Sequence, residues 1–341
     1  MRVAIVNRDP EGRVRELGSI DDPVDPIGER RRPCRSLSLG GGREYAHGEH
    51  TWDERSHGCA PVYISRSMMQ VAHMDAALEI NRDTWDTLAV THRRDASGFY
   101  HIAAMLAGED ALCPIDAAEI GDLRGLRVAH LQCHIGVDSI YLARRGASVV
   151  GLDFSPVAIR EARQLAEQAN VQVQFVEANV YDAREHLDGE FDRVYTTWGT
   201  IVWLPDVRRW ARVIASLLRP GGRLYFADGH PSLLCSDMVD GRMTVTTAWR
   251  TPADQPLAES GDRSYTGDIT PMRHTREWVH PMGDILNALI DAGLRIEWVH
   301  EHTAIPWAHN SAMRIGDDRL FRLPADVPQC PLGLSIEATK L

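Results

Sequence analysis

Short apolar runs alternate with helix-like segments over the middle of the chain, and this alternation limits the possible fold more than any other feature. The runs with strand character are 126–131, 149–153, 171–177, 191–197 and 224–227. Strands joined through a helix pair in parallel, because a parallel return needs a crossover connection. The pattern therefore predicts an α/β fold with a doubly wound, mostly parallel sheet.

The ends of the predicted helices carry typical capping residues. Ser155 and Pro156 supply an N-cap side chain and a proline at the first position of a helix that reaches Gln168. Gly146 and Gly293 each follow a helical pattern, and glycine commonly ends a helix. These residues support the placing of helices between the strands.

Further elements complete the predicted domain. Helical segments near 75–89 and 100–106 precede the first strand and would form N-terminal cap helices. The regular alternation lapses over about 231–280, which we interpret as an inserted lid. Runs at 294–299 and 334–339 predict two closing strands, so that the sheet has seven strands in a Rossmann-like arrangement.

The first 73 residues differ from the rest in composition. They contain a run of three glycines, a run of three arginines and no sustained hydrophobic period, which is typical of a poorly ordered extension. The segment is either functionless, or upstream of a start at Met68, Met69 or Met74, or a flap over the site. We therefore expect the working domain to span 74–341.

Composition excludes several classes of protein. Hydrophobic residues make up 44% and charged residues 25% of the chain, and no stretch approaches the ~20 apolar residues of a membrane span. We expect no secretory signal, because Met1 to Pro10 has no apolar core followed by a cleavage site, and the six cysteines form no C-x-x-C pair. The net charge of −11 disfavours a nucleic-acid partner. We expect a soluble cytoplasmic protein that acts on a small molecule without a metal, and the formation of a homo-oligomer stays open.

A cofactor site is predicted where the first two strands end. A turn that leaves a parallel strand and opens a helix presents backbone N–H groups to an anionic group. Asp153 ends the second strand, where a carboxylate can accept both hydroxyls of a ribose. S-adenosylmethionine and a dinucleotide would both fit these two features.

Several motifs, in order and spacing, resemble those of the class I S-adenosylmethionine-dependent methyltransferases. The resemblance is closer to a bacterial subgroup whose first motif reads L-Q-C-H-x-G, and it runs from about Asn81 to the C-terminus. The matching segments are Leu131-Gln132-Cys133-His134-Ile135-Gly136, Gly151-Leu152-Asp153-Phe154-Ser155, Phe191-Asp192-Arg193-Val194-Tyr195, Trp203-Leu204-Pro205-Asp206 and Arg219-Pro220-Gly221-Gly222.

The first motif departs from the pattern of the broader class. His130 stands at its usual acidic position, and Gln132 and His134 stand at two of its glycine positions. Gly136 is the one glycine left in the turn. A side chain of Gln132 or His134 could then replace a backbone contact to the cofactor.

The resemblance implies an enzyme that moves the methyl group of S-adenosylmethionine to a small-molecule acceptor. It also implies a set of cofactor-binding residues: Gln132, Cys133, His134 and Gly136 for the methionine part, Asp153 for the ribose, Phe154 beside the adenine, and Asn179 with Val180 for the adenine edge. Cys133 is expected to be a packed residue and not a nucleophile.

Candidate residues for the reaction follow the fourth and fifth strands. Thr197, Trp198 and Trp203 are predicted to contact the acceptor, since aromatic walls hold planar molecules and exclude water. Trp203 could instead only pack under the next helix. His230 and His280 are the candidate catalytic bases, needed if the acceptor is a hydroxyl.

Two other functions stay open at this point. An NAD-dependent oxidoreductase would need a G-x-G-x-x-G turn, which the segment 132–136 does not have. A non-catalytic regulatory protein that only binds S-adenosylmethionine would share the cofactor site but give no methylated product.

Overall fold

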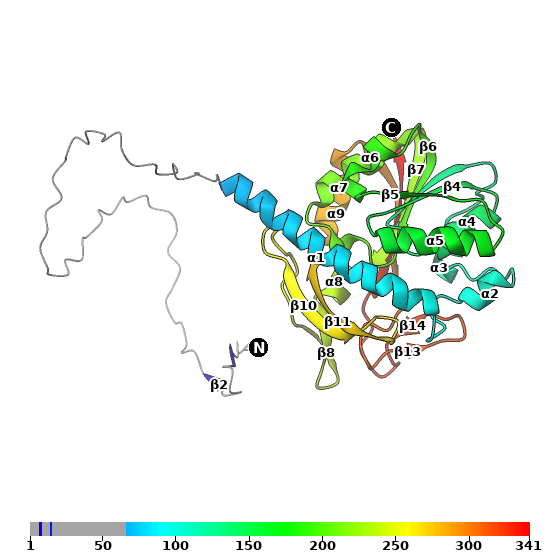
Figure 1. Ribbon diagram of the computed structural model, residues 1–341. Coiled ribbons are helices and arrows are strands. Elements are labelled where there is room, and N and C mark those ends of the chain that lie inside the picture. The colour runs from blue at the N-terminus through cyan, green and yellow to red at the C-terminus, as the bar shows by residue number, and fades with distance from the viewer. Residues whose placement is uncertain (1–6, 9–13, 16–65) are drawn as a thin grey trace, which may run out of the picture. The chain divides into compact units, whose positions relative to one another are not determined.

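The computed structural model describes residues 7–8, 14–15 and 66–341 (Figure 1). The contacts divide the chain into two units, 1–61 and 62–341, and each is described by itself. In the first, β1 (Asn7–Arg8) pairs antiparallel with β2 (Val14–Arg15). Apart from these four residues, the extension predicted over 1–73 lies outside the described residues as far as residue 65. Its last residues, 66–73, belong to a helix that begins at Arg66.

The second unit contains a seven-stranded sheet in the order β12-β15-β7-β6-β3-β4-β5. Its strands are β3 (Arg127–Leu131), β4 (Ser148–Asp153), β5 (Gln174–Glu177), β6 (Phe191–Thr197), β7 (Leu218–Gly229), β12 (Leu294–His302) and β15 (Gly333–Lys340). Only β15 among these runs antiparallel to its neighbours. The predicted doubly wound, mostly parallel sheet is confirmed.

Helices cover both faces of this sheet. They are α1 (Arg66–Arg94), α2 (Ile102–Leu106), α3 (Pro114–Glu119), α4 (Val137–Arg144), α5 (Pro156–Gln168), α6 (Ala183–His186), α7 (Val207–Leu217), α8 (Pro231–Leu234) and α9 (Met282–Asp291), with 3-10 turns η1 (Val180–Asp182) and η2 (Ile201–Trp203). Side chains of β3 alternate between two buried cores: Ala129 packs with α7 and α9, and Val128 packs with α4 and α5. None of the described helices is long and apolar enough to cross a membrane.

The helix caps form as the sequence predicts. The Ser155 hydroxyl accepts the N–H of Ala158 at 2.9 Å, and Pro156 is the first residue of α5. The third strand starts three residues later than predicted. Asn170 ends α5 in the left-handed conformation, with φ of 50°, and the N–H of Val171 bonds back to the helix, so that the next residues belong to the connection.

The predicted lid region contains helix α8 and two hairpins. One pairs β8 (Ser236–Val239) with β9 (Arg242–Val245), and the other pairs β10 (Leu257–Arg263) with β11 (Ile269–Glu277). Helix α1 lies against the second hairpin and against α5 (Figure 1). The Asn81 side chain bonds both backbone groups of Arg276, at 2.7 and 2.8 Å. Helix α1 and this hairpin are therefore joined by direct hydrogen bonds.

A second insertion, between β12 and β15, has no counterpart in the sequence prediction. It contains a short hairpin of β13 (Arg314–Ile315) and β14 (Phe321–Arg322). Trp307 and Arg319 of this insertion reach the cavity described next. Part of the site is thus built by a segment that is remote from the first motif in sequence.

Candidate active site

A cavity lies at the carboxyl ends of β3, β4, β5 and β6, where ligands bind in open parallel sheets. All of the residues predicted to contact cofactor or acceptor line it: Gln132, Cys133, His134, Gly136, Asp153, Phe154, Asn179, Val180, Thr197, Trp198 and Trp203. The structure therefore brings together residues from four separate strand ends. Further walls come from α1, from the β10–β11 hairpin and from the second insertion.

The turn after β3 has a left-handed backbone at two positions that carry side chains. Gln132 and His134 have φ of 55° and 50°, in the left-handed region. This conformation costs a residue with a side chain about 1–2 kcal/mol. The Gln132 amide offsets part of this cost by donating to the carbonyl of Thr200 at 2.9 Å, which joins the turn to the loop after β6. His130, in β3 itself, is buried and bonds Ser139, and burial lowers its pKa to about 3.

Gly136 is required for close packing as well as for its backbone conformation. Its φ is 74°, and an added Cβ would lie 2.7 Å from Phe175 and 2.8 Å from Ala162. We expect Gly136→Ala to lower the free energy of unfolding by about 3 kcal/mol, since strain and overpacking add. Gly98→Ala is the matched control, because Gly98 has φ of 73° and open space around it. Urea unfolding measures both, and equal losses would contradict the packing argument.

Asp153 lies at the cavity wall with both carboxylate oxygens held in place. One oxygen accepts the N–H of His134 and the other accepts the N–H of Ser155, each at 2.9 Å. Burial raises the pKa of Asp153 to about 6, and no described cation pairs with it. Because each carboxylate oxygen has about two acceptor positions, each can accept one more hydrogen bond from the cavity.

The residues after β4 and β5 form the neighbouring wall. Phe154 follows Asp153 and lines the cavity. The Asn179 side chain accepts the N–H of Tyr181 at 3.0 Å and so caps the 3-10 turn that starts at Val180. This capping role uses one acceptor position of the side-chain oxygen and leaves the amide nitrogen and the other position for a ligand. Cys133 is buried, and burial raises its pKa well above the usual range, as suits a packed residue.

Several polar atoms at the cavity are buried and have no partner among the described residues. They are Gln132 Oε1, His134 Nδ1, Tyr141 Oη and Thr197 Oγ1. An unsatisfied buried polar group costs about 1–3 kcal/mol, so native structures rarely keep such groups without a reason. Their position in one cavity indicates that a polar ligand completes the site.

Helix α1 and the β10–β11 hairpin close the cavity through a chain of hydrogen bonds. His92 Nδ1 is 2.9 Å from His134 Nε2, and His92 Nε2 is 2.5 Å from the hydroxyl of Ser264 in the hairpin turn. Burial lowers the pKa of His92 to about 3, so both rings stay neutral near pH 7. Trp85 packs edge-on against His134 and Trp203. The first motif is thus linked directly to the covering elements.

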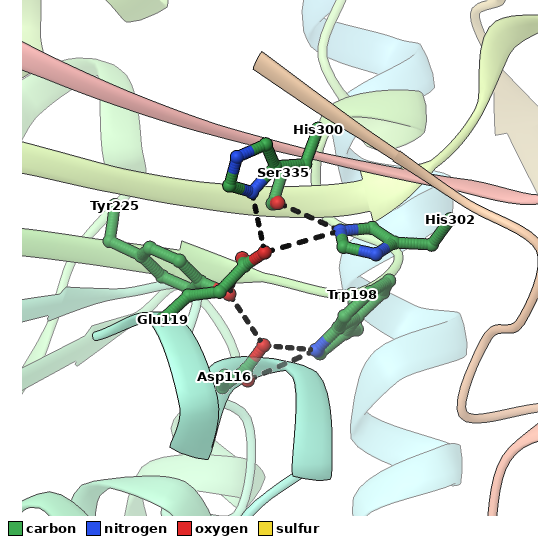
Figure 2. Close-up of polar contacts among 7 residues, drawn as sticks. All are labelled: Asp116, Glu119, Trp198, Tyr225, His300, His302 and Ser335. Atoms are coloured by element: carbon green, nitrogen blue, oxygen red, sulfur yellow. Dashed lines mark hydrogen bonds and ion pairs between the residues drawn. The ribbon is translucent and has the colours of Figure 1, made fainter. Parts of the chain in front are cut away.

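Trp198 is held in place by a buried carboxylate (Figure 2). Its φ is 53°, and its indole N–H donates to both oxygens of Asp116 at 3.0 Å. Tyr195 and Tyr225 also contact Asp116, at 2.6 and 3.1 Å, and the Tyr225 hydroxyl lies 3.0 Å from Glu119. Since a tyrosine donates one proton, Tyr225 cannot donate to both carboxylates at once.

Beyond Glu119 the contacts of Figure 2 reach two histidines of β12. The ring of His300 donates to Glu119 at 2.8 Å, and His302 bonds the hydroxyl of Ser335 at 2.8 Å. The two histidines share a face of the strand, and both have protein partners. They extend the polar contacts of Asp116 from the cavity wall to the partly exposed side of β12.

The buried Asp116 makes stability depend on pH. Burial raises its pKa from 3.8 to about 7. The folded state then binds the proton more tightly than the unfolded chain, and stability is lost as pH rises from about 4 to about 7. We expect the difference in unfolding free energy between the wild type and Asp116→Asn to fall over this range and to level off above it. Urea unfolding between pH 4 and 8 measures this, and a flat difference would contradict it.

A second buried carboxylate shapes the loop after β6. Asp228, near the end of β7, accepts the backbone N–H groups of Gly199, Thr200 and Ile201 at 2.7, 2.9 and 3.0 Å. It also accepts the Gly229 N–H and the Thr200 hydroxyl. This carboxylate therefore fixes the backbone between Trp198 and Trp203. The indole N–H of Trp203 donates to the carbonyl of Gly199 and holds the loop further.

The two histidines predicted as catalytic bases, His230 and His280, are not among the residues that line the cavity. His230 caps the short helix α8, its ring accepts the N–H of Ser232, and its other nitrogen lies 3.1 Å from Glu301. His280 is buried and donates to the carbonyl of Leu204 at 2.7 Å. Burial lowers the pKa of both rings. Their hydrogen bonds are used within the protein, so this geometry gives no support to either as a base.

Sequence reasoning missed several residues of the site. Asp116, Asp138 and Asp228 are acidic residues that lie in or beside the cavity wall, and Tyr265 and Arg319 come from the insertions. Asp228 had a usable signal, because it is an acidic residue near the carboxyl end of a predicted strand. Asp138 also had one, as an acidic residue in the first turn after the first motif.

Comparison with known proteins finds similarity to methyltransferases. Residues 128–222 match the family described as "Methyltransferase domain". The chain is 29% identical over 194 residues to a ubiquinone biosynthesis O-methyltransferase of Xanthomonas euvesicatoria, which covers 56% of this chain and 72% of that protein. A second such protein, of Xanthomonas axonopodis, is 29% identical over 191 residues, with 55% and 71% covered.

Solved structures give more distant matches. A methyltransferase structure from Mesorhizobium loti matches with a TM-score of 0.46 and 24% identity, over 69% of this chain and 100% of that one. Magnesium protoporphyrin IX methyltransferase of Synechocystis, solved with bound S-adenosylhomocysteine, matches with a TM-score of 0.46 and 18% identity, over 78% and 100%.

Proposed function

This chain is an S-adenosylmethionine-dependent methyltransferase, and we propose that it methylates a hydroxyl group of a small planar acceptor. The curated relatives are named O-methyltransferases, which favours oxygen as the methylated atom. We also propose that it belongs to the bacterial subgroup with an L-Q-C-H-x-G first motif. A cytoplasmic location and a possible homo-oligomer stay predictions.

The cofactor would lie along the carboxyl ends of β3, β4 and β5. Asp153 would accept the ribose hydroxyls, Phe154 would lie beside the adenine, and Asn179 with Val180 would face its edge. Gln132 and His134 would bond the methionine part with the buried atoms that now have no partner. These orphaned atoms, together with the two free acceptor positions of Asp153, fit a ligand that carries both an amino acid and a ribose.

The acceptor would lie against the aromatic walls of the same cavity. Trp198 and Trp203 follow β6, and Trp85, Tyr100 and Tyr265 cover them from α1, the segment after it and the β10–β11 hairpin. Aromatic faces bind planar molecules and exclude water. This aromatic lining beside the cofactor residues is the observation that carries the proposal of a planar acceptor.

The side chains of this protein would orient the acceptor toward the methyl group and exclude water from the cavity. When bound, the cofactor supplies a methyl group on a sulfonium, which a nucleophile displaces in line. Asp116 and Asp228 hold the loop that carries Trp198, and the reacting atoms must come within about 3 to 3.5 Å. We propose that the 231–280 region acts as the lid, since its hairpin bonds to His92 and thereby closes the cavity.

The test is a product search with labelled S-adenosylmethionine. Purified protein is incubated with the labelled cofactor and a panel of hydroxy-aromatic, amino-aromatic and thiol compounds, and products are analysed by mass spectrometry. We expect methyl transfer to oxygen of the hydroxy-aromatic compounds. Products formed only on nitrogen or sulfur, or cofactor binding with no product from any compound, would contradict the proposal.

A further inference from the structure

One acidic side chain of the cavity has no part in holding the protein together. Asp138 is the second residue of α4, directly after the first motif, and it lines the cavity. Among the described residues, it has no hydrogen-bond partner and no ion pair. A carboxylate in this position is free to meet a ligand.

The surroundings of Asp138 place it away from the ribose end of the site. Asp138 and Tyr141 lie three residues apart on α4, so they share a face of the helix, and both line the cavity. Burial raises the pKa of Tyr100, Tyr141 and Tyr265, and also that of Cys113, and the charge of Asp138 adds to each shift. These four residues line the cavity and come from the segment after α1, from α4, from the hairpin turn and from the residue before α3. Asp138 therefore faces the aromatic part of the cavity, where we place the acceptor.

The ionisation of Asp138 suits proton transfer near neutral pH. Burial raises its pKa to about 6, so the carboxylate is mostly ionised at pH 7 but is a stronger base than an exposed aspartate. A base is most effective when its pKa lies near the working pH. The other titratable groups around it are the three tyrosines, Cys113, Tyr195 and Asp116. Burial raises the pKa of all of these, and Asp116 titrates in the same range, as does Asp153 in the part of the cavity that we assign to the ribose.

We propose that Asp138 is the general base of this methyltransferase, which takes the proton from the hydroxyl of the acceptor. The acceptor oxygen forms a bond to the methyl carbon as the carbon–sulfur bond of the cofactor breaks, the electron pair stays on sulfur, and the hydroxyl proton goes to the Asp138 carboxylate. This assignment rests on the proposed function, because a hydroxyl acceptor must give up its proton when its oxygen is methylated.

The test compares Asp138→Asn with the wild type on two phenols. Catechol needs a base near pH 7, whereas the nitro group of 4-nitrocatechol lets its hydroxyl ionise unaided near neutral pH. We expect the variant to lose about 100-fold or more in kcat/KM on catechol and no more than about threefold on 4-nitrocatechol. The acidic limb of the catechol rate near pH 6 should disappear in Asp138→Asn and persist in Asp116→Asn. The variant Asp188→Asn, which replaces an exposed aspartate far from the reaction in this account, is the control for the removal of one carboxylate.

A measurement without turnover separates this role from cofactor binding. Calorimetric titration with S-adenosylhomocysteine should give affinities for the wild type and Asp138→Asn within about threefold of each other. A large loss of that affinity would assign Asp138 to the amino group of the cofactor and overturn the proposal. Equal losses on both phenols, or wild-type rates on catechol, would also overturn it. If the wild type methylates no hydroxy-aromatic compound of the panel, the proposed function fails and the inference falls with it.

Discussion

Replacing Asp153 with alanine is expected to reduce affinity for S-adenosylhomocysteine at least about 100-fold, because each lost hydrogen bond to a charged group costs about 1.5–3 kcal/mol. Two such bonds, to the ribose hydroxyls, would be lost. The N–H groups of His134 and Ser155 would also lose their acceptor, so the turn of the first motif would loosen. Calorimetric titration with S-adenosylhomocysteine measures the change in affinity.

A matched control separates this loss from general destabilisation. Ser155→Ala removes the side chain that caps α5 and costs about 1 kcal/mol of stability, but it keeps the backbone N–H that Asp153 accepts. We expect Ser155→Ala to bind S-adenosylhomocysteine as the wild type does. Near-wild-type affinity in Asp153→Ala would show that the ribose does not lie at this carboxylate.

Replacing Asp228 with alanine is expected to lower the free energy of unfolding by about 3 kcal/mol or more, because each buried donor left without an acceptor costs about 1–3 kcal/mol. The donors are four backbone N–H groups and the Thr200 hydroxyl. Urea unfolding measures this loss. Methyl transfer should fall as well, because the freed loop carries Trp198 and Trp203 into the cavity.

Asp228→Asn serves as the paired variant. Its side-chain oxygen can still accept some of these N–H groups, so its loss of stability should be clearly smaller than that of alanine. If both variants unfold at the wild-type urea concentration, the carboxylate does not anchor the loop, and the position of Trp198 must depend on Asp116 alone.

The elements that the sequence predicts well are those with local causes. The apolar runs of β3, β4 and β6 and the cap at Ser155 are set by neighbours within a few residues, and the structure matches them. Asp153 and Gln132 could be assigned to one cavity because parallel strands bring their carboxyl ends to one edge.

The parts that could not be predicted depend on contacts between distant segments. Nothing near Asp116 in sequence indicates that it bonds Trp198, which lies 82 residues away. The link from His92 to Ser264 spans 172 residues and joins α1 to a hairpin turn. Both pairings arise only when segments that are distant in the sequence come together in the fold.

The candidate histidines show that the place of a residue at the end of a strand does not by itself assign it to the cavity. His230 does follow the strand β7, as the sequence indicates, but the cap of α8 binds its ring to Ser232. A residue at the right edge of a sheet can therefore face a helix end instead of the cavity, and the backbone conformation decides which.

The most direct measurement of the central claim is a crystal structure of the chain with S-adenosylhomocysteine bound. The account predicts the nucleoside in the cavity at the carboxyl ends of β3, β4 and β5, with its ribose hydroxyls bonded to Asp153. Electron density for the nucleoside at another surface, or in this cavity with no contact between the ribose and Asp153, would contradict it.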